Sequence, residues 1–285
     1  MTSGLAVLLS VLLFVLTACS GAGASPSPSA APSVAPTTAS SGSAAPSAKP
    51  VELTIYGAAS LKGALAAAKA AYETAHPGAT VTLSTGSSAA LETQIEQGAP
   101  ADAFLSADTT NPKKLVDAGL ADGAAVTFAG KKLTVIVPTA NPADITSPKD
   151  LAGSGVKVIV AGDEVPITKY ATELVDNLAN EAGYPADFAA KYIANIASKE
   201  EDVKSVVAKI EIGEGDAGIV YETDAKASIK VTTVDVPPSA NVRAAYAGVV
   251  VKASKNAAAA KAFLDWFAGP DGQAILSSFG FQPPS

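Results

Sequence analysis

The sequence predicts an α/β fold built on mainly parallel sheets. From Val51 onward, short β-rich runs alternate with segments whose apolar residues recur at helical spacing. Such alternation is typical of parallel sheets, because parallel neighbours need a crossover connection that is usually a helix. The chain has 285 residues, which is enough for one or two domains with a sizeable core.

The first 50 residues are predicted to lie outside this fold. The apolar run from Leu5 to Ala18 is too short to span a bilayer comfortably and is typical of a signal-peptide core. The sequence Leu16-Thr-Ala-Cys19 resembles a bacterial lipobox, in which the cysteine is lipidated after cleavage. We expect a lipoprotein signal peptide over residues 1–18 and a lipid anchor on Cys19, although no Lys or Arg precedes the apolar run; a buried thiol is the alternative for Cys19.

Residues 19–50 are predicted to form a tether. After Cys19 the chain is almost entirely Ser, Ala, Pro, Gly and Thr, and such a stretch cannot bury enough apolar area to offset the entropy of ordering. A glycosylated stalk is the alternative to a disordered tether. Because Cys19 is the only cysteine, the folded part must rely on its core rather than on disulfides.

The strands and helices of the folded part follow one another along the chain. The β-rich runs predict strands at Leu53–Tyr56, Thr80–Leu83, Ala103–Ser106, Leu133–Val137, Val156–Val160, Ala217–Val220, Lys230–Val234 and Ala247–Val251. The helical patterns lie at about Leu61–Thr74, Ala89–Gln97, Pro112–Asp117, Thr168–Glu181, Pro185–Ile193, Glu201–Ile212 and Ala257–Phe267.

Two serine turns stand where a predicted strand leads into a predicted helix. Ser60 follows the first strand, and Ser87 and Ser88 follow the second. In open α/β sheets ligands bind beyond the carboxyl ends of strands, next to helix N-termini whose first N–H groups have no partner within the helix. The turns therefore suggest an anion site with neutral donors, and the alternative for each serine is an ordinary helix cap.

Composition and spacing argue against several other functions. The net charge is −7 without a basic cluster, which argues against nucleic acid as a partner. A serine hydrolase using Ser60 or Ser88 would need a base, and the only histidine, His76, precedes Pro77-Gly78 in a predicted turn. The distribution of His, Cys, Asp and Glu predicts no metal-cation site, and the glycine turns match no Walker or dinucleotide motif. We expect no enzyme activity and no cofactor.

Six stretches, in order, closely resemble the ModA family of molybdate-binding proteins, the solute-binding components of molybdate ABC transporters. The resemblance runs from about Leu53 to Phe281. Its stretches are Gly57-Ala-Ala-Ser60-Leu61, Gly86-Ser-Ser-Ala-Ala-Leu91, Gln94 to Asp108 with Gly98-Ala-Pro-Ala-Asp102, Gly162-Asp-Glu-Val165-Pro166-Ile-Thr-Lys-Tyr170, Glu201-Asp202-Val203 and Gly218-Ile-Val-Tyr221-Glu-Thr-Asp224-Ala225.

The resemblance implies a two-lobed fold like that of periplasmic binding proteins (type II). Lobe one would comprise residues 51–132 plus 242–285, and lobe two residues 133–241. The crossings near Val135 and Val242 would form a two-strand hinge, and the lobes would close on a dehydrated oxyanion.

The resemblance also implies a set of neutral ligands for the oxyanion. Ser60, Ser88 and Tyr221 would donate hydroxyl hydrogens, and Ile167 and Val203 would donate backbone N–H groups. Four helix N-termini, at roughly +0.5 elementary charge each, would offer about +2 against the ligand's −2. Secondary candidates are Ser87, one residue out of register, and Thr168, where the family usually has Gly.

The implied function is extracytoplasmic binding of molybdate and tungstate for delivery to the permease of an ABC transporter. The protein would be a monomer held at the cell membrane by lipid on Cys19. The alternatives are a binding protein for sulfate, phosphate or another tetrahedral oxyanion, and an extracellular sensor domain. A phosphate site would favour an acceptor such as Asp among its ligands, and the matched positions supply none.

Overall fold

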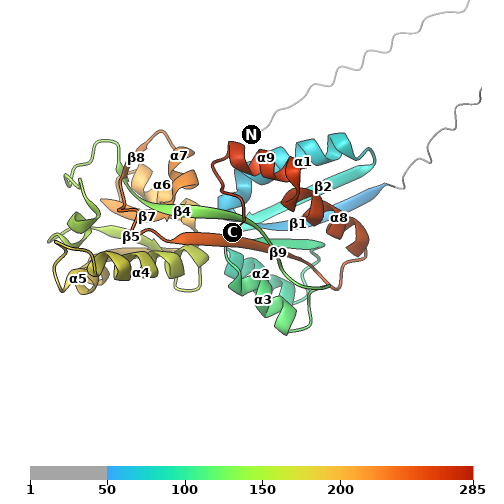
Figure 1. Cartoon of the computed structure of the whole chain (residues 1–285), viewed down its shortest axis with the longest axis horizontal. Coiled ribbons are helices and arrows are strands. Elements are labelled where there is room, and N and C mark those ends of the chain that lie inside the picture. Colours follow the sequence, from blue (N-terminus) through green and yellow to red (C-terminus); the bar gives the residue numbers. More distant parts are fainter. Residues whose placement is uncertain (1–49, 285) are drawn as a thin grey trace, which may run out of the picture. The chain divides into compact units, whose positions relative to one another are not determined.

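The structure is a computed structural model and describes residues 50–284, which form a mixed α/β fold (Figure 1). The predicted signal peptide, Cys19 and nearly all of the tether lie outside the described residues. Within residues 50–284, no helix is both long and apolar enough to cross a membrane.

The N-terminal part of the fold is a parallel sheet, here called the first sheet. Its central strand pairs in parallel with the other two, and the helices α1 and α8 cover one face while α2 and α3 cover the other (Figure 1). The strands are β1 (Val51–Ala58), β2 (Ala79–Gly86) and β3 (Ala103–Ser106), with β1 in the centre. The helices are α1 (Lys62–Ala75), α2 (Ser88–Glu96), α3 (Thr110–Asp117) and α8 (Ala257–Ala268), with α9 (Pro270–Ser278) packed on α1 and α8.

A second sheet repeats this arrangement. Its central strand again has two parallel neighbours, with α4 and α5 on one face and α6 and α7 on the other (Figure 1). The strands are β5 (Val158–Ala161) in the centre, β6 (Ile196–Glu200) and β7 (Ala217–Tyr221). The helices are α4 (Pro166–Ala179), α5 (Phe188–Ala194), α6 (Val203–Glu211) and α7 (Glu222–Lys226).

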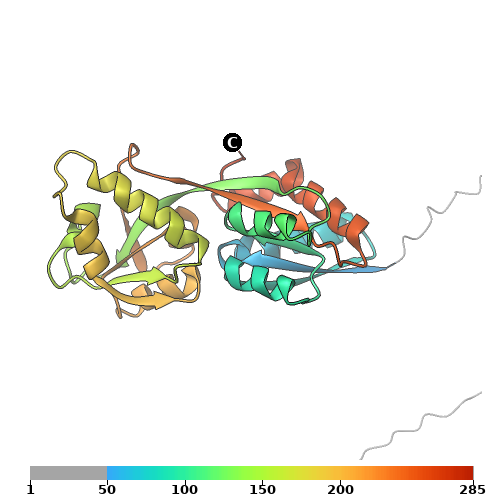
Figure 2. The ribbon, with the colours of Figure 1, turned by 90° about the horizontal axis from the view of Figure 1, so that it is seen from below.

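Two antiparallel strands, β4 (Val126–Pro138) and β9 (Arg243–Val250), join the sheets. They run side by side in Figure 2. Up to Lys132, β4 pairs with β9, which also pairs with β3; from Leu133 onward β4 pairs with β7 and with β8 (Val231–Val234). The lobe bounds stay a prediction, and β4 changes its partner where the first of them falls.

At this change of partner, a side chain takes the place of a strand. The Leu133 N–H donates to Asn241 Oδ1 at 3.1 Å, and Asn241 Nδ2 donates to the Leu133 carbonyl at 2.8 Å. One asparagine therefore satisfies both backbone groups of Leu133 that would otherwise face a missing neighbour.

Each predicted strand and helix has a counterpart, and the fold class is confirmed. The parallel sheets are accompanied by more antiparallel pairing than expected, through β4, β8 and β9. The sequence patterns do not predict β6, α7 and α9. The half-buried β6 lacks a strong apolar run, α7 spans one turn, and α9 follows the α8 terminus at Gly269 and Pro270. The apolar core lies between the sheets and their helices.

Candidate anion-binding site

A small cavity lies where strands of both sheets end and helices begin. Ser60, Ser88, Ile167, Val203 and Tyr221, which the sequence analysis named as ligands, all line it, and so does Ser87. The remaining lining residues are Ala58, Ala59, Gly86, Ala107, Val165, Pro166 and Asp202. We call this space the anion cavity.

Ser60 lies in a short 3₁₀ turn, η1 (Ala59–Leu61), between β1 and α1. It is not the N-cap residue of either helical segment; these are Ala58 for η1 and Leu61 for α1. Instead, Ser60 Oγ lies 2.8 Å from Tyr246 Oη of β9, and Ser60 is buried. When the Tyr246 hydroxyl donates, the Ser60 hydroxyl hydrogen is available to a ligand.

The second serine turn places two hydroxyls on the anion cavity. Ser88 is the first residue of α2 and is buried, and its Oγ accepts a hydrogen bond from the Ala107 N–H at 3.1 Å. The N–H fixes the oxygen and leaves the hydroxyl hydrogen free to donate elsewhere. Ser87 is the N-cap residue of α2 but makes no capping hydrogen bond, and it is half-buried. The structure thus brings both register alternatives to the cavity.

Two helices of the second sheet begin on the opposite wall. Pro166 occupies the first turn of α4, so Ile167 follows with a backbone N–H that has no acceptor within the helix. At α6, the Asp202 side chain caps the helix by accepting from the Ser205 N–H at 2.9 Å. This cap leaves the N–H of Val203 without an acceptor within the helix.

Tyr221 supplies the one phenol on the cavity. It ends β7, it is 1% exposed, and its Oη makes no hydrogen bond with any residue of the described part of the chain. Burial raises the pKa of this phenol well above its usual range, so it keeps its proton and remains a donor. A buried donor without an acceptor costs about 1–3 kcal/mol, which a bound anion would offset.

A buried lysine, which the sequence analysis missed, lies behind these donors. Lys131 of β4 is 1% exposed, its Nζ lies 3.3 Å from the Ser60 carbonyl oxygen, and it stands 3.7 Å from the ring centroid of Phe281. Burial lowers the pKa of this amine to about 7. Lys131 does not line the cavity. Its neighbour Lys132 is exposed, because successive residues of β4 face opposite sides of the strand, and the sequence alone does not show which of the two lysines is buried.

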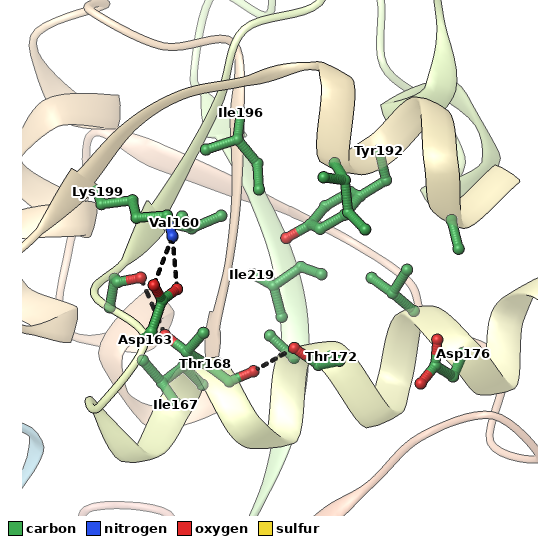
Figure 3. A pocket seen from close by; sticks show the side chains of 15 residues that line it. Val160, Asp163, Ile167, Thr168, Thr172, Asp176, Tyr192, Ile196, Lys199 and Ile219 are labelled. Carbon is green, nitrogen blue, oxygen red and sulfur yellow. Dashed lines mark hydrogen bonds and ion pairs between the residues drawn. The ribbon is translucent and has the colours of Figure 1, made fainter.

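Thr168 faces a different cavity. Its hydroxyl donates to the carbonyls of Ala161 at 3.0 Å and Gly162 at 2.8 Å, so it satisfies the backbone at the end of β5, just before its own helix. Figure 3 shows it with Thr172 along α4, at the edge of a largely apolar cavity of about 260 Å³ between α4, α5 and the second sheet. Ile167 lines both cavities, whereas Thr168 lines only this one.

A wide groove with many carboxylates leads to the anion cavity and shares Ser87, Val165 and Asp202 with it. Asp163 pairs with Lys199 and Glu200 with Lys209. Glu92 of α2 is buried in this groove, and burial, with a hydrogen bond to Glu96, raises the pKa of its carboxyl to about 7. Six acidic residues and one lysine, Lys114, line the groove. The acidic residues are Glu92, Asp163, Glu164, Glu200, Glu201 and Asp202. We call this the acidic groove.

The lone histidine lies away from both serines' hydroxyls. His76 follows α1, its ring stacks on Tyr72, and its Nδ1 lies 3.0 Å from the Tyr72 carbonyl oxygen. In residues 50–284, no group of three or more His, Cys, Asp or Glu side chains is arranged to hold a metal ion. The geometry of the anion cavity therefore suits recognition of an acceptor-rich anion by neutral donors.

Comparison with known proteins agrees with this geometry. Residues 53–282 match the family described as bacterial extracellular solute-binding protein. The molybdate-binding protein ModA of Mycobacterium bovis is 32% identical over 81% of this chain and 85% of its own length, and ModA of Escherichia coli is 32% identical over 81% and 88%. The periplasmic molybdate-binding protein of Azotobacter vinelandii is similar in structure, with a TM-score of 0.69 and 25% identity over 82% of this chain and all of its own. The chain belongs to the bacterial extracellular solute-binding protein family, and its described part has the fold of periplasmic binding proteins.

Proposed function

We propose that this protein binds molybdate in the anion cavity and delivers it to the permease of an ABC transporter. The observation that carries the proposal is the buried Tyr221 hydroxyl, a donor without an acceptor among the described residues, on a cavity that serines and helix starts also line. Molybdate is a dianion with only acceptor atoms, so hydroxyl and N–H donors suit it. The relatives named as molybdate-binding proteins support the same ligand.

The proposed ligands are Ser60, Ser88 and Tyr221 through their hydroxyls, and Ile167 and Val203 through their backbone N–H groups. Both serines have a partner that leaves a hydroxyl hydrogen available, Tyr246 for Ser60 and the Ala107 N–H for Ser88. Tungstate has nearly the shape and charge of molybdate and should also bind. Sulfate is smaller, so donors spaced for molybdate cannot all reach it.

Binding is proposed to close two lobes, residues 51–132 plus 242–285 and residues 133–241, about the crossing strands β4 and β9. The proposed ligands that line the anion cavity come from both segments, Ser60 and Ser88 from the first and Ile167, Val203 and Tyr221 from the second. A ligand that touches both segments stabilises the closed arrangement over an open one. The closed protein would act as a monomer, with no enzymatic step.

The protein is proposed to work at the outer face of the cell membrane. Cys19, which lies outside the described residues, would carry the lipid, and residues 20–50 would tether the domain near the permease. Palmitate labelling of the full chain that disappears in Cys19→Ala would support this anchor, and labelling that persists in the variant would contradict it.

Titration calorimetry tests the ligand assignment. Full-length protein should bind molybdate and tungstate tightly, and both ions should raise its melting temperature by mass action. Sulfate, phosphate and chromate are the comparison ligands. Sulfate binding as tight as molybdate binding would overturn the assignment to molybdate.

A further inference from the structure

Lys131 is a buried amine without a carboxylate partner. Among residues 50–284, no carboxylate lies within ion-pair distance of its Nζ. Its neighbour Lys132 is exposed on the same strand. An ammonium withdrawn from water needs compensating charge or dipoles, because desolvation disfavours the charged form.

Two neighbours of Lys131, Ser60 and Tyr221, line the anion cavity. Its Nζ lies 3.3 Å from the Ser60 carbonyl oxygen and 5.0 and 5.2 Å from the ring centroids of Tyr246 and Tyr221. Tyr246 in turn contacts the Ser60 hydroxyl, and Tyr221 lines the cavity. The amine therefore lies next to the backbone of one proposed ligand residue, Ser60, and near the ring of another, Tyr221, and its strand β4 is one of the two that join the sheets.

The other titratable groups around Lys131 are accounted for. Burial raises the pKa of the Tyr221 and Tyr246 phenols well above their usual range, so both stay neutral. Asp224 of α7 favours the protonated amine, but its carboxylate is 2.7 Å from Lys204 of α6, which disfavours it. Neither group therefore gives Lys131 a dedicated counter-ion.

We propose that Lys131 is the positioning cation of the anion site, and that a tetrahedral dianion in the cavity becomes its counter-ion and is bound together with one proton taken up by its amine. The inference rests on the proposed function, since it needs a dianion in the anion cavity. The proton joins the Nζ lone pair, no other bond changes, and the complex gains two negative charges from the ligand and one positive charge from the proton.

The sign of the pH dependence follows from this coupling. Without ligand, the amine loses its proton as the pH rises through about 7, because burial lowers its pKa. A bound dianion raises that pKa, since an opposite charge favours the protonated form. Affinity should therefore be highest at low pH and should fall as the pH rises above about 7, by up to about tenfold per pH unit.

Calorimetry with the full chain tests the proposal. Molybdate is titrated from about pH 6.5 to about pH 9 in buffers of different ionisation enthalpy, which reports the protons taken up on binding. Wild type should show net proton uptake above about pH 7. Lys131→Met, which keeps an unbranched apolar chain against the aromatic rings, should bind at least about tenfold more weakly at pH 6.5, without uptake and with a flat pH profile.

Lys132→Met is the matched control, because it removes a lysine from the same strand at an exposed position. It should keep the wild-type affinity, proton uptake and pH profile. Lys131→Met that keeps the wild-type proton uptake and pH slope would overturn the proposal, whatever its affinity. A loss of affinity with the slope intact would show a packing role only.

The same titrations separate this inference from the proposed function. If the wild type binds molybdate without proton uptake, the proposed role of Lys131 is refuted and the proposed function stands. Wild type that binds sulfate or phosphate in place of molybdate refutes the proposed ligand, and the Lys131→Met comparison with that dianion then decides the inference. Wild type that binds no tetrahedral dianion refutes both.

Discussion

Tyr221 is the last residue of a buried strand, and its hydroxyl makes no hydrogen bond with any described residue. The two serine hydroxyls differ from it, because each is oriented by one protein partner and still has a hydrogen to donate. All three residues line the anion cavity, and in the proposed function their hydroxyls donate to one bound anion. Their contributions should be separable by single substitutions.

Tyr221→Phe removes the unpartnered hydroxyl and keeps the ring. We expect molybdate affinity to fall by about ten- to a hundredfold, because a hydrogen bond to a charged group contributes about 1.5–3 kcal/mol. The stability of the ligand-free protein should stay equal or rise, since the variant no longer buries an unsatisfied donor.

The control for this variant is Tyr192→Phe, a buried tyrosine of α5 on the apolar cavity. Calorimetry should show wild-type molybdate affinity for Tyr192→Phe. Equal affinities of wild type and Tyr221→Phe would place the ligand elsewhere.

Ser88→Ala and Ser87→Ala decide the register of the second serine turn. Ser88 is buried and fixed by the Ala107 N–H, whereas Ser87 is half-buried and makes no capping bond. We expect Ser88→Ala to weaken molybdate binding by about tenfold or more, and Ser87→Ala to change it by less. The reverse order of the two dissociation constants would assign the ligand role to Ser87.

At the scale of whole elements, the site is a meeting of helix starts. The N-termini of α2, α4 and α6 and the 3₁₀ turn before α1 all open on the anion cavity, where their partial positive charge favours an anion. Asp202 introduces an opposing charge at one of these helix starts, because this acidic residue caps α6 and also lines the cavity.

Asp202→Asn separates the two effects of this residue. Asparagine caps a helix as well as aspartate does, so stability should change little. Removing a negative charge beside a dianion should tighten molybdate binding severalfold. Asp202→Ala, as the comparison, should lower the free energy of unfolding by about 0.5–2 kcal/mol through loss of the cap. Weaker molybdate binding by Asp202→Asn would mean that the carboxylate orients the Val203 N–H.

Sequence predicts the residues of such a site when they lie in local motifs, and does not predict residues that only tertiary packing brings to the site. Ser60, Ser88, Ile167, Val203 and Tyr221 lie in local motifs that resemble the ModA family, and this resemblance was enough to select residues that line one cavity. Lys131 and Tyr246 could not be named, because their role depends on the side chain packed behind each motif in three dimensions. The edge strand β6 was missed for a related reason, since half-buried polar strands lack a clear apolar pattern.

At the scale of the molecule, charge works against the ligand's approach. The chain carries a net charge of −7, and the acidic groove leads to the anion cavity. Local donors must therefore hold an anion that the surrounding field repels. The field acts over distances that salt screens, whereas the donors act at contact.

The association rate of molybdate should rise with ionic strength, which is opposite to the usual behaviour of steered ligands. Stopped-flow mixing between about 0.01 and 0.2 M salt should show a severalfold increase, as the Debye length shortens. The double variant Glu164→Gln with Glu201→Gln, two exposed groove positions, should bind faster at low salt and respond less to added salt. An association rate that falls with salt would contradict this repulsion.

Leu133 has its own consequence for measurement. Leu133 pairs with Tyr221 of β7 on one side of β4. On the other side, its N–H donates its hydrogen bond to the side chain of Asn241 and not to a neighbouring strand. A side chain can swing away without breaking a ladder, so this single amide should exchange its hydrogen for deuterium faster than the Val135 amide inside β4. Molybdate should slow that exchange and Asn241→Ala should speed it. The exchange rate of this one backbone amide would then report how often the protein opens between its two sheets.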